Sequence, residues 1–425
     1  MSCQTKFWGH HYLLSTKFWM MIILGVGLMV RISLVFLTLH NTDHTRMDSV
    51  EPYFIATSLA EHGTYADAFG PGTGPSAHTT PVLPLLMALI IRIVGGGLAG
   101  YLARSILSSI VSSAAYALLP LLAVRCRMGI LPGVIAGLVG AAVPFNFYNQ
   151  IAGDFDQPYT MLGLVIFCCL LSVYWVQASF PVRGGILLGL FCGLLCLLSP
   201  VVSQVLIACF LFGLLCFAGK RREFSIFMAT VVALIVICLS PWAYRNYKAL
   251  GKVIWTRSNF GLELSVSNND NASADYEVNV MSPSSPHPFS QAKENERIRR
   301  MGELAYNQAR LKEALTWIRS HPARFAQLSV QRYTLFWFPI MRRWWQTAAL
   351  ILISIVAIAG LFDLLRKRHP AAWMFLAILL SYPAVHTVIE VGPRYRLPIE
   401  PILLLLTGWF CVSLWNKFAV APDGN

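Results

Sequence analysis

Two carboxylates, Asp48 and Glu51, follow the first long apolar run of the chain and stand three residues apart. On a helix, side chains at this spacing share one face. A carboxylate just beyond a membrane helix is partly withdrawn from water, which raises its pKa toward the range that a general base needs. The alternative is that both are solvated acids at a helix start, where Pro52 also fits. The same loop supplies two candidate substrate-binding residues, Tyr53 and His78.

A second pair of acids, Asp154 and Asp156, lies in the segment "NQIAGDFDQPYTML". We expect one of them to cap the helix that begins near Pro158. The other is then free for a site. Two loops with acids on one side of a membrane could converge, as sites between the helices of a bundle do. Both aspartates are therefore candidate catalytic residues.

Basic side chains in two later segments are candidates for binding a phosphate. Arg245 lies among aromatic residues in "SPWAYRNYKALGKVIWTRSNFGLEL", which also holds the candidate substrate-binding residue Asn259. The planar guanidinium of arginine suits an anionic lipid headgroup. The alternative for this segment is a generic belt of aromatic and basic residues at the membrane interface.

The other segment is "HTVIEVGPRYRLPIEP", which holds Arg394, Arg396 and the candidate substrate-binding residue Glu390. Two arginines two residues apart in a proline-bounded loop could clamp phosphate oxygens. Alternatively, they pair with Glu390 or Glu400 and fix the loop. The sequence has no Walker motif, no GxGxxG after a strand, no HExxH and no GxSxG, so the familiar nucleotide, zinc-protease and hydrolase signatures are absent.

The elements that must position these residues are membrane helices. Of the 425 residues, 56% are hydrophobic and 12% are charged, whereas an average soluble domain has about a quarter charged residues. Several apolar runs reach the roughly 20 residues that a bilayer core of about 30 Å requires. The sequence predicts an all-α polytopic transmembrane bundle of ten or eleven helices with juxtamembrane helices and outside loops. Expected crossings lie near 19–40, 101–123, 128–147, 158–178, 184–199, 202–219, 224–242, 346–365, 371–388 and 398–416.

A shorter run at 80–97 decides the topology. If it lies along the membrane surface and the N-terminus is inside, the short inside loops carry the Lys and Arg clusters, as the positive-inside rule expects. If it crosses, those clusters face outward. We therefore expect ten crossings, with both termini cytoplasmic and the polar loops outside, although eleven crossings stay open. Three regions follow: an N-terminal membrane core (1–242) with the outside loop 41–100, an outside region (243–345) with an amphipathic helix near 291–319, and C-terminal membrane helices (346–425).

The net charge of +13 is dispersed in short clusters between apolar runs, which indicates membrane topology and not nucleic-acid binding. Most of the ten cysteines lie within apolar runs, and no CxxC pair occurs in a polar loop. The sequence therefore predicts neither a disulfide framework nor a zinc site.

The order of these segments resembles the GT-C superfamily of polyprenyl-phosphate-sugar-dependent membrane glycosyltransferases, particularly the bacterial branch related to family 39 mannosyltransferases and aminoarabinose transferases. The segments that carry the resemblance span nearly the whole chain in order. They are an acid followed by "YFIATSLAEHG", then "GTGPSAHTTPVLPLL", "YLARSILSSI", the Arg245 segment, "HPARFAQLSVQRYTLFW" and "GPRYRLPIEP".

The resemblance implies an inverting transferase in the bacterial inner membrane whose first outside loop carries the base, while a lipid-linked phosphate leaves. It favours Glu51 over Asp48 as the base, because the spacing of the following residues is kept after Glu51. It also implies that an acid of the second turn contributes, Asp154 or Asp156. The donor would be a polyprenyl-phosphate sugar, and the acceptor a lipid, a glycan or a protein.

By the same resemblance Arg394 and Arg396 hold the donor phosphate, with Arg245 nearby. Metal dependence varies in the superfamily. The sequence shows no His cluster for zinc, but an acid pair with a divalent metal ion stays open.

Two other functions remain as alternatives. One is a transporter or flippase of a lipid-linked or anionic substrate, which should place ionisable residues near the middle of the bilayer. Few ionisable residues lie within the apolar runs, and Arg31 is the exception that lies away from a helix end. The other is a non-catalytic membrane scaffold with a degenerate site.

Overall fold

The computed structural model describes residues 4–39, 50–143 and 145–419. Within these ranges the secondary structure is helical, and β pairing is limited to two isolated bridges. The fold is therefore an all-α membrane bundle, as predicted. Asp48 lies outside the described residues, so its role as a candidate base stays a prediction.

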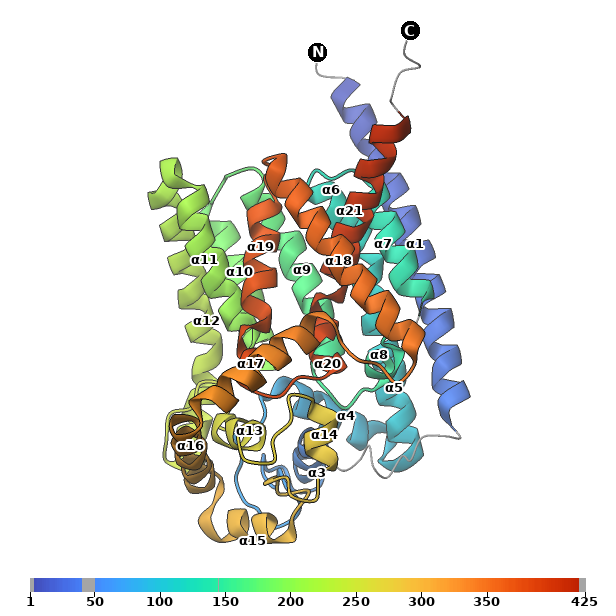
Figure 1. Ribbon diagram of the computed structural model, residues 1–425. Helices are drawn as coiled ribbons and strands as arrows, with labels where there is room; N and C mark the ends of the chain where they lie inside the picture. Colours follow the sequence, from blue (N-terminus) through green and yellow to red (C-terminus); the bar gives the residue numbers. More distant parts are fainter. Residues whose placement is uncertain (1–3, 40–49, 144, 420–425) are drawn as a thin grey trace.

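Among the described residues, six stretches are long and apolar enough to cross a membrane. They consist of α1 (Gln4–Thr38), α5 (Gly97–Ala117) with α6 (Leu119–Arg125), α9 (Gln157–Trp175), α12 (Arg221–Leu250), α18 (Trp344–Arg366), and α20 (Pro393–Arg396) with α21 (Glu400–Ala419). Shorter apolar helices pack among them, namely α7 (Leu131–Ala142), α10 (Val182–Leu198), α11 (Val202–Cys216) and α19 (Ala372–Ser381). Figure 1 shows these helices side by side, with the start of α1 and the end of α21 at the upper end of the bundle.

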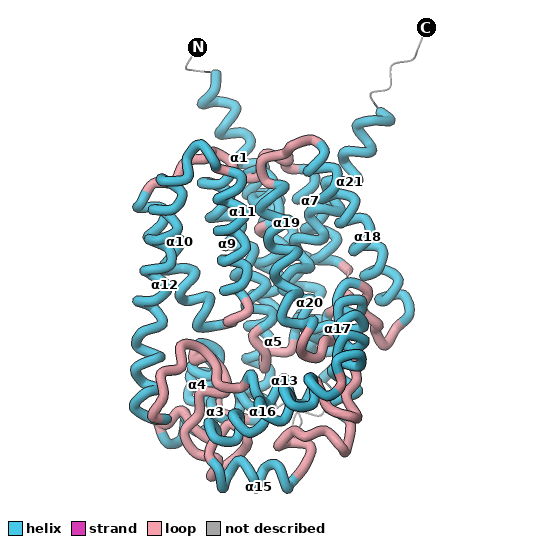
Figure 2. The backbone as a smooth tube through the Cα atoms, turned by 60° about the vertical axis from the view of Figure 1, so that its left-hand side comes forward, coloured by secondary structure: helices cyan, strands magenta, loops and turns pink. Residues whose placement is uncertain are grey.

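The remaining helices gather at the opposite end, shown at the bottom of Figures 1 and 2. They are α3 (Glu51–His62), α4 (Val82–Val94), α8 (Phe147–Ile151), α13 (Phe260–Ser267), α14 (Tyr276–Met281), α15 (Ala292–Met301), α16 (Glu303–Ser320) and α17 (Pro322–Trp337). The amphipathic helix expected near 291–319 is two helices, α15 and α16. The break falls at Gly302, whose φ of +76° suits glycine and ends α15.

The helix α4 corresponds to the run at 80–97. It lies beside α3 at the lower end of the bundle, where the non-crossing prediction expects it (Figure 1). The guanidinium of Arg92 donates hydrogen bonds to the backbone oxygens of Leu59 and Ala60 in α3. These bonds join α3 and α4 into one unit beneath the bundle.

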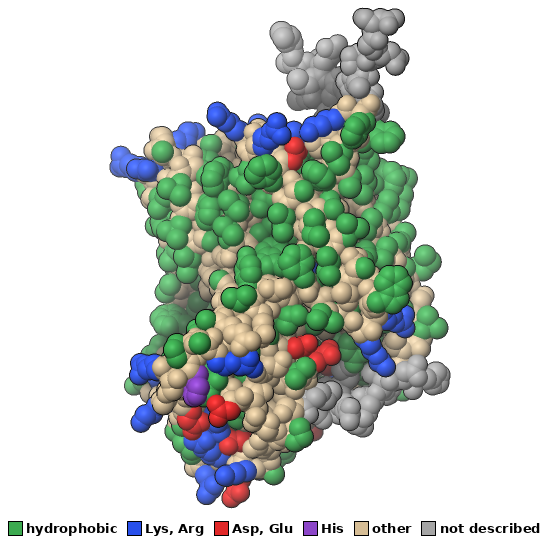
Figure 3. Space-filling model, viewed as in Figure 1, with side chains coloured by type: hydrophobic (Ala, Val, Ile, Leu, Met, Phe, Trp, Pro, Cys, Tyr) green, Lys and Arg blue, Asp and Glu red, His purple; other side chains and the backbone are tan. Residues whose placement is uncertain are grey.

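Charged side chains divide between the two ends of the molecule. In Figure 3 a rim of Lys and Arg lies along the top, a broad apolar belt follows, and acidic and basic side chains mix at the bottom. The turn after α18 contributes Arg366, Lys367 and Arg368. A membrane protein with a basic cytoplasmic face would show this division. The predicted orientation, with the basic end cytoplasmic and the polar loops outside, stays a prediction.

Arg31 lies within the apolar length of α1 and is 2% exposed. Its guanidinium donates to the backbone oxygens of Gly27, Gly140 and Ala141 and to Oε1 of Gln150. The bonds cross-link α1, α7 and α8. They give Arg31 a structural role, which removes the one sequence feature that favoured a transporter.

Candidate functional site

Glu51 is the first residue of α3, with Pro52 directly after it. An acid in the first turn is stabilised by the free N–H groups there. Its Oε1 lies 3.3 Å from Nε2 of His287 and 4.0 Å from Nε2 of His78. Burial raises the pKa of the carboxyl group, but the hydrogen bond from His287 and the nearby histidines outweigh it and lower the pKa to about 2. Glu51 is therefore ionised throughout the physiological pH range, and the expectation that withdrawal from water raises its pKa toward neutrality is wrong, because the two histidines outweigh burial.

His287 lies in the loop between α14 and α15, far from Glu51 in the sequence. The backbone N–H of Phe289 donates to its Nδ1 at 3.2 Å, which places the ring hydrogen on Nε2, toward Glu51. Burial lowers the pKa of His287, yet the hydrogen bond and charge of Glu51 outweigh burial and raise it. The ring of Phe69 packs edge-on against both His78 and His287, with centroid distances of 4.8 and 5.7 Å. Aromatic packing thus holds both histidines at the carboxylate.

Arg394, on α20, lies in a cage of aromatic rings. Its guanidinium carbon lies 4.0 Å from the ring centre of Tyr276, 4.3 Å from that of Phe155 and 4.7 Å from that of Tyr395. Its Nη2 donates to the hydroxyl group of Tyr395 at 2.7 Å, whereas its buried Nε has no hydrogen-bond partner among the described residues. Stacked rings fix the plane of the cation.

Tyr276 connects the Glu51 side of the site with the Arg394 side. Burial raises the pKa of Tyr276; the charge of Arg394 opposes this rise, and the charges of Glu51, Glu390 and Glu263 add to it. Charges at both ends of the site therefore influence the pKa of Tyr276. Tyr276 contacts Arg394 directly and lies within reach of the charge of Glu51.

Glu390 is 2% exposed and lies just before α20. Its Oε2 accepts a hydrogen bond from Asn279 at 2.6 Å, and its backbone N–H donates to Ser267. Burial and the charge of Glu263 raise the pKa of Glu390 to about 8. At neutral pH its carboxyl group is therefore largely protonated and can donate a hydrogen bond.

Arg104 links the first loop with the second turn. Its Nε lies 2.8 Å from Oδ1 of Asp154, and both side chains are 1% exposed. The guanidinium carbon of Arg104 lies 4.7 Å from the ring centre of Tyr53 in α3. The two acidic segments thus converge through an arginine of α5. Tyr53 lies two residues from Glu51, so this chain of contacts positions α3.

Asp156 occupies the N-cap position of α9, but its side chain makes no capping hydrogen bond. It pairs instead with Nη2 of Arg257 at 3.0 Å. The expectation that one of the two aspartates caps this helix with its side chain is wrong, because both carboxylates bind arginines. Asn259, two residues after Arg257, donates to Glu263 at 3.0 Å and so orients one of the acids that surround Tyr276.

The chain is similar to an archaeal oligosaccharyltransferase. The crystal structure of the Archaeoglobus fulgidus enzyme, tethered by a disulfide bond to an acceptor peptide with the NVT sequon, matches with a TM-score of 0.58 and 14% sequence identity. The match covers 95% of this chain and 50% of the archaeal one, so this chain spans about half the length of that protein. No family model and no curated protein matches the sequence. At this identity the likeness shows a shared fold alone.

Two of the predicted phosphate-binding arginines bind the protein itself. Arg396 is 1% exposed and donates to the backbone oxygens of Trp337 and Leu350 and to Oγ of Ser354. Arg245 donates to the backbone oxygens of Ser76 and Tyr65 in the first loop. Arg396 thus fastens α20 to α17 and α18, and Arg245 fastens the first loop to the end of α12.

The described residues hold no preformed cluster of metal-ligating side chains. No group of three His, Cys, Asp or Glu side chains in the described ranges could hold a metal ion together. Glu51 is hydrogen-bonded to His287, while Asp154 and Asp156 are paired with arginines. A divalent metal ion held by an acid pair therefore stays a prediction from the sequence.

Sequence reasoning missed His287 and Tyr276, two side chains at the centre of the site. His287 is one histidine in the proline-rich stretch "SPSSPHPFS", and Tyr276 precedes it on a short helix. Neither forms a spaced pattern with Glu51 or Arg394. The available signal was compositional: histidine and aromatic residues on the polar side of a membrane protein.

Proposed function

We propose that the protein is an integral membrane glycosyltransferase that moves a sugar from a polyprenyl-phosphate donor to an acceptor, with inversion at the anomeric carbon. The observation that carries the proposal is one site, in a GT-C-like fold, with an ionised carboxylate at one end and an aromatic-caged arginine at the other. This arrangement suits a single displacement.

Glu51 acts as the general base. It is ionised at neutral pH, and His287 fixes its position through the hydrogen bond to Oε1. In the reaction the acceptor oxygen or nitrogen loses its proton to Glu51 and forms a bond to the anomeric carbon. The bond between that carbon and the phosphate oxygen breaks on the opposite face, which inverts the configuration.

Arg394 stabilises the leaving phosphate. The phosphate departs with the electron pair of the broken bond, and a fixed cation stabilises that charge more in the transition state than in the donor. The Nε of Arg394, which has no partner among the described residues, is the donor that a phosphate oxygen would use. The protonated carboxyl group of Glu390 tolerates an approaching anion better than a second carboxylate would.

The bundle suits the two parts of such a donor. A prenyl chain is soluble in the bilayer, beside the apolar belt, while the sugar phosphate stays at the polar end (Figure 3). We propose that this end faces the periplasm or cell exterior and that both termini are cytoplasmic. Ser284→Cys should then react with a membrane-impermeant maleimide in intact cells, whereas Arg222→Cys should react only after lysis. The reverse pattern would overturn this orientation.

The central test is transfer of labelled sugar from a polyprenyl-phosphate donor in membranes that contain the full chain. Glu51→Gln should lower transfer by about 10²–10⁴-fold, and Arg394→Ala by about 10²–10³-fold. The matched control is Glu61→Gln, an exposed acid on the same helix, which should transfer like the wild type. Asp48→Asn, measured in parallel, compares the two acids of the first loop. Wild-type transfer by both Glu51→Gln and Arg394→Ala would refute the site.

A further inference from the structure

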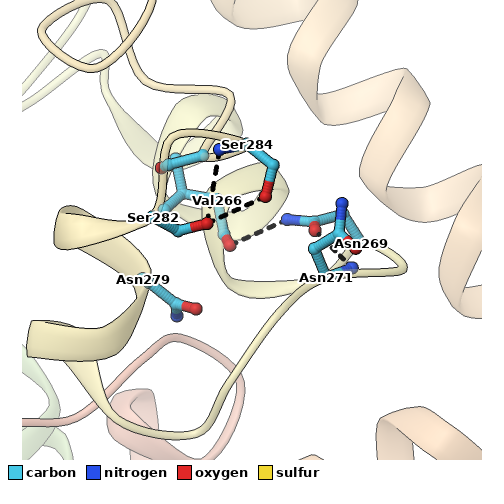
Figure 4. Close-up of a pocket in the computed structure, with 7 residues that line it drawn as sticks. Val266, Asn269, Asn271, Asn279, Ser282 and Ser284 are labelled. Carbon is cyan, nitrogen blue, oxygen red and sulfur yellow. Dashed lines mark hydrogen bonds between the residues drawn. The ribbon is translucent and has the colours of Figure 1, made fainter.

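A polar cavity of about 290 Å³ opens beside the loop that carries His287. Its wall comes from the end of α13 and the following loop, from the loop after α14, and from one face of α16. A smaller pocket adjoins it and shares Asn269, Asn271 and Ser284 with it (Figure 4). The cavity is close in size to the smallest small-molecule sites, which begin at about 300 Å³.

Two buried hydroxyl groups in these walls lack a hydrogen-bond partner among the described residues. Ser265 lines the cavity and is 4% exposed, and Ser285 lines the adjoining pocket and is 5% exposed. A buried polar group without a partner costs about 1–3 kcal/mol. A ligand that can both donate and accept hydrogen bonds would remove this cost.

The charges around the cavity disfavour an anion. Arg310 is its only lining cation among the described residues, and it is already paired with Glu294 and Glu313. Asp270 and Glu313 add two carboxylates to the same wall. A phosphate would therefore meet more negative than positive charge, so this cavity differs from the donor end of the site at Arg394.

The lining suits an uncharged sugar. Sugar hydroxyl groups both donate and accept, as serine hydroxyl and asparagine amide groups do. Asn271 offers an exposed amide at the rim, and Trp317, whose indole N–H binds Asp270 at 2.7 Å, offers a fixed apolar surface. A pyranose ring has the matching combination of hydroxyl groups and apolar C–H faces.

We propose that this cavity binds an uncharged glycan portion of the acceptor. The proposal rests on the proposed glycosyltransferase function. Pro286 lines the cavity, and the next residue, His287, contacts Glu51. A glycan held there would therefore lie next to the base-carrying end of the site, while the lipid-linked donor occupies the Arg394 end.

The test measures sugar binding without any donor, by saturation-transfer-difference NMR on the full chain in lipid nanodiscs free of sugar detergents. The probes are cellobiose, chitobiose and a hexapeptide of serine and asparagine. The blocking variant is Asn271→Trp, which fills the cavity from its exposed rim. Its control is Gln308→Trp on α16, because at 3.6 residues per turn Gln308 lies on the opposite face from Arg310 and Ala314.

A disaccharide signal that is present in the wild type and Gln308→Trp but lost in Asn271→Trp supports the proposal. Ser265→Ala should weaken binding by about 2- to 10-fold without lowering thermal stability, because the hydroxyl group has no partner in the protein. No disaccharide signal, equal signals in both tryptophan variants, or a signal from the peptide alone would overturn the proposal. Since no donor is present, Glu51→Gln protein should still bind. Loss of transfer and loss of glycan binding can thus be told apart.

Discussion

Asp154 and Asp156 are two residues apart and were both candidate acids, yet the structure predicts different consequences for their removal. Asp154 and its partner Arg104 are each 1% exposed, whereas Asp156 is 12% and its partner Arg257 is 27% exposed. Asp154→Ala would take the carboxylate from a buried guanidinium. Asp156→Ala would take it from a guanidinium that water reaches.

The expected magnitudes follow from this burial. Removing one partner of a buried ion pair costs about 3–5 kcal/mol, while exposed pairs contribute about 0–1 kcal/mol. The Asp156 pair is partly exposed and should lie near the upper end of the second range. The two variants should therefore differ by about 3 kcal/mol in the free energy of unfolding, which is roughly a 100-fold difference in the folding equilibrium.

The assay is reversible unfolding of the purified protein in a titration with sodium dodecyl sulfate, followed by helical circular dichroism. The double variant Arg104→Met, Asp154→Ala removes both buried charges and should be more stable than Asp154→Ala alone. Equal destabilisation by Asp154→Ala and Asp156→Ala, or a double variant less stable than Asp154→Ala, would refute the reasoning.

Three further predictions concern the site and its support. His287→Gln removes the main group that lowers the pKa of Glu51. Transfer falls as Glu51 becomes protonated at low pH, so the acid limb of the pH–rate profile should move to higher pH; an unchanged limb would show that the contact does not act on the base. Arg394→Lys keeps the charge but loses the planar group stacked on three rings, so the KM for the donor should rise by about tenfold or more, and a wild-type KM would contradict the cage. Arg31→Met should lower stability in the detergent titration by at least about 1–3 kcal/mol, because its backbone acceptors lose their donor, while transfer per folded molecule stays near that of the wild type.

The sequence was sufficient for the helical bundle because membrane helices depend on local composition. Runs of about 20 apolar residues need no partner to be recognised, and basic clusters mark the turns between them. The short run at 80–97 was predicted not to cross because it is short and contains two prolines and Arg92, and that topology stays a prediction. Glu51 was preferred to Asp48 because the residues after it keep the spacing of the resembled family, and its role as the base stays a proposal.

Contacts between distant segments could not be predicted from composition. Glu51 contacts His287, although in the sequence most of the N-terminal membrane helices lie between them. Asp156 likewise pairs with Arg257, which comes from a later segment of the chain. An aspartate before a helix with proline in its first turn usually predicts a cap. However, the charged guanidinium of an arginine from another element is a stronger hydrogen-bond donor to the carboxylate than a backbone N–H. The carboxylate of Asp156 therefore pairs with Arg257 and does not cap α9.

The two arginines of "GPRYRLP" show how local geometry limits a sequence hypothesis. Their spacing suggested a clamp in which both guanidinium groups face one phosphate, as they could in an extended loop. The structure places Arg394 and Arg396 on the short helix α20, where residues two apart point about 200° away from each other. Arg394 turns toward the aromatic cage, and Arg396 turns into the bundle toward the backbone oxygens of Trp337 and Leu350. The buried Arg396 fixes α20 to the membrane helices, and this rigid attachment would hold Arg394 in a defined position for the proposed leaving phosphate.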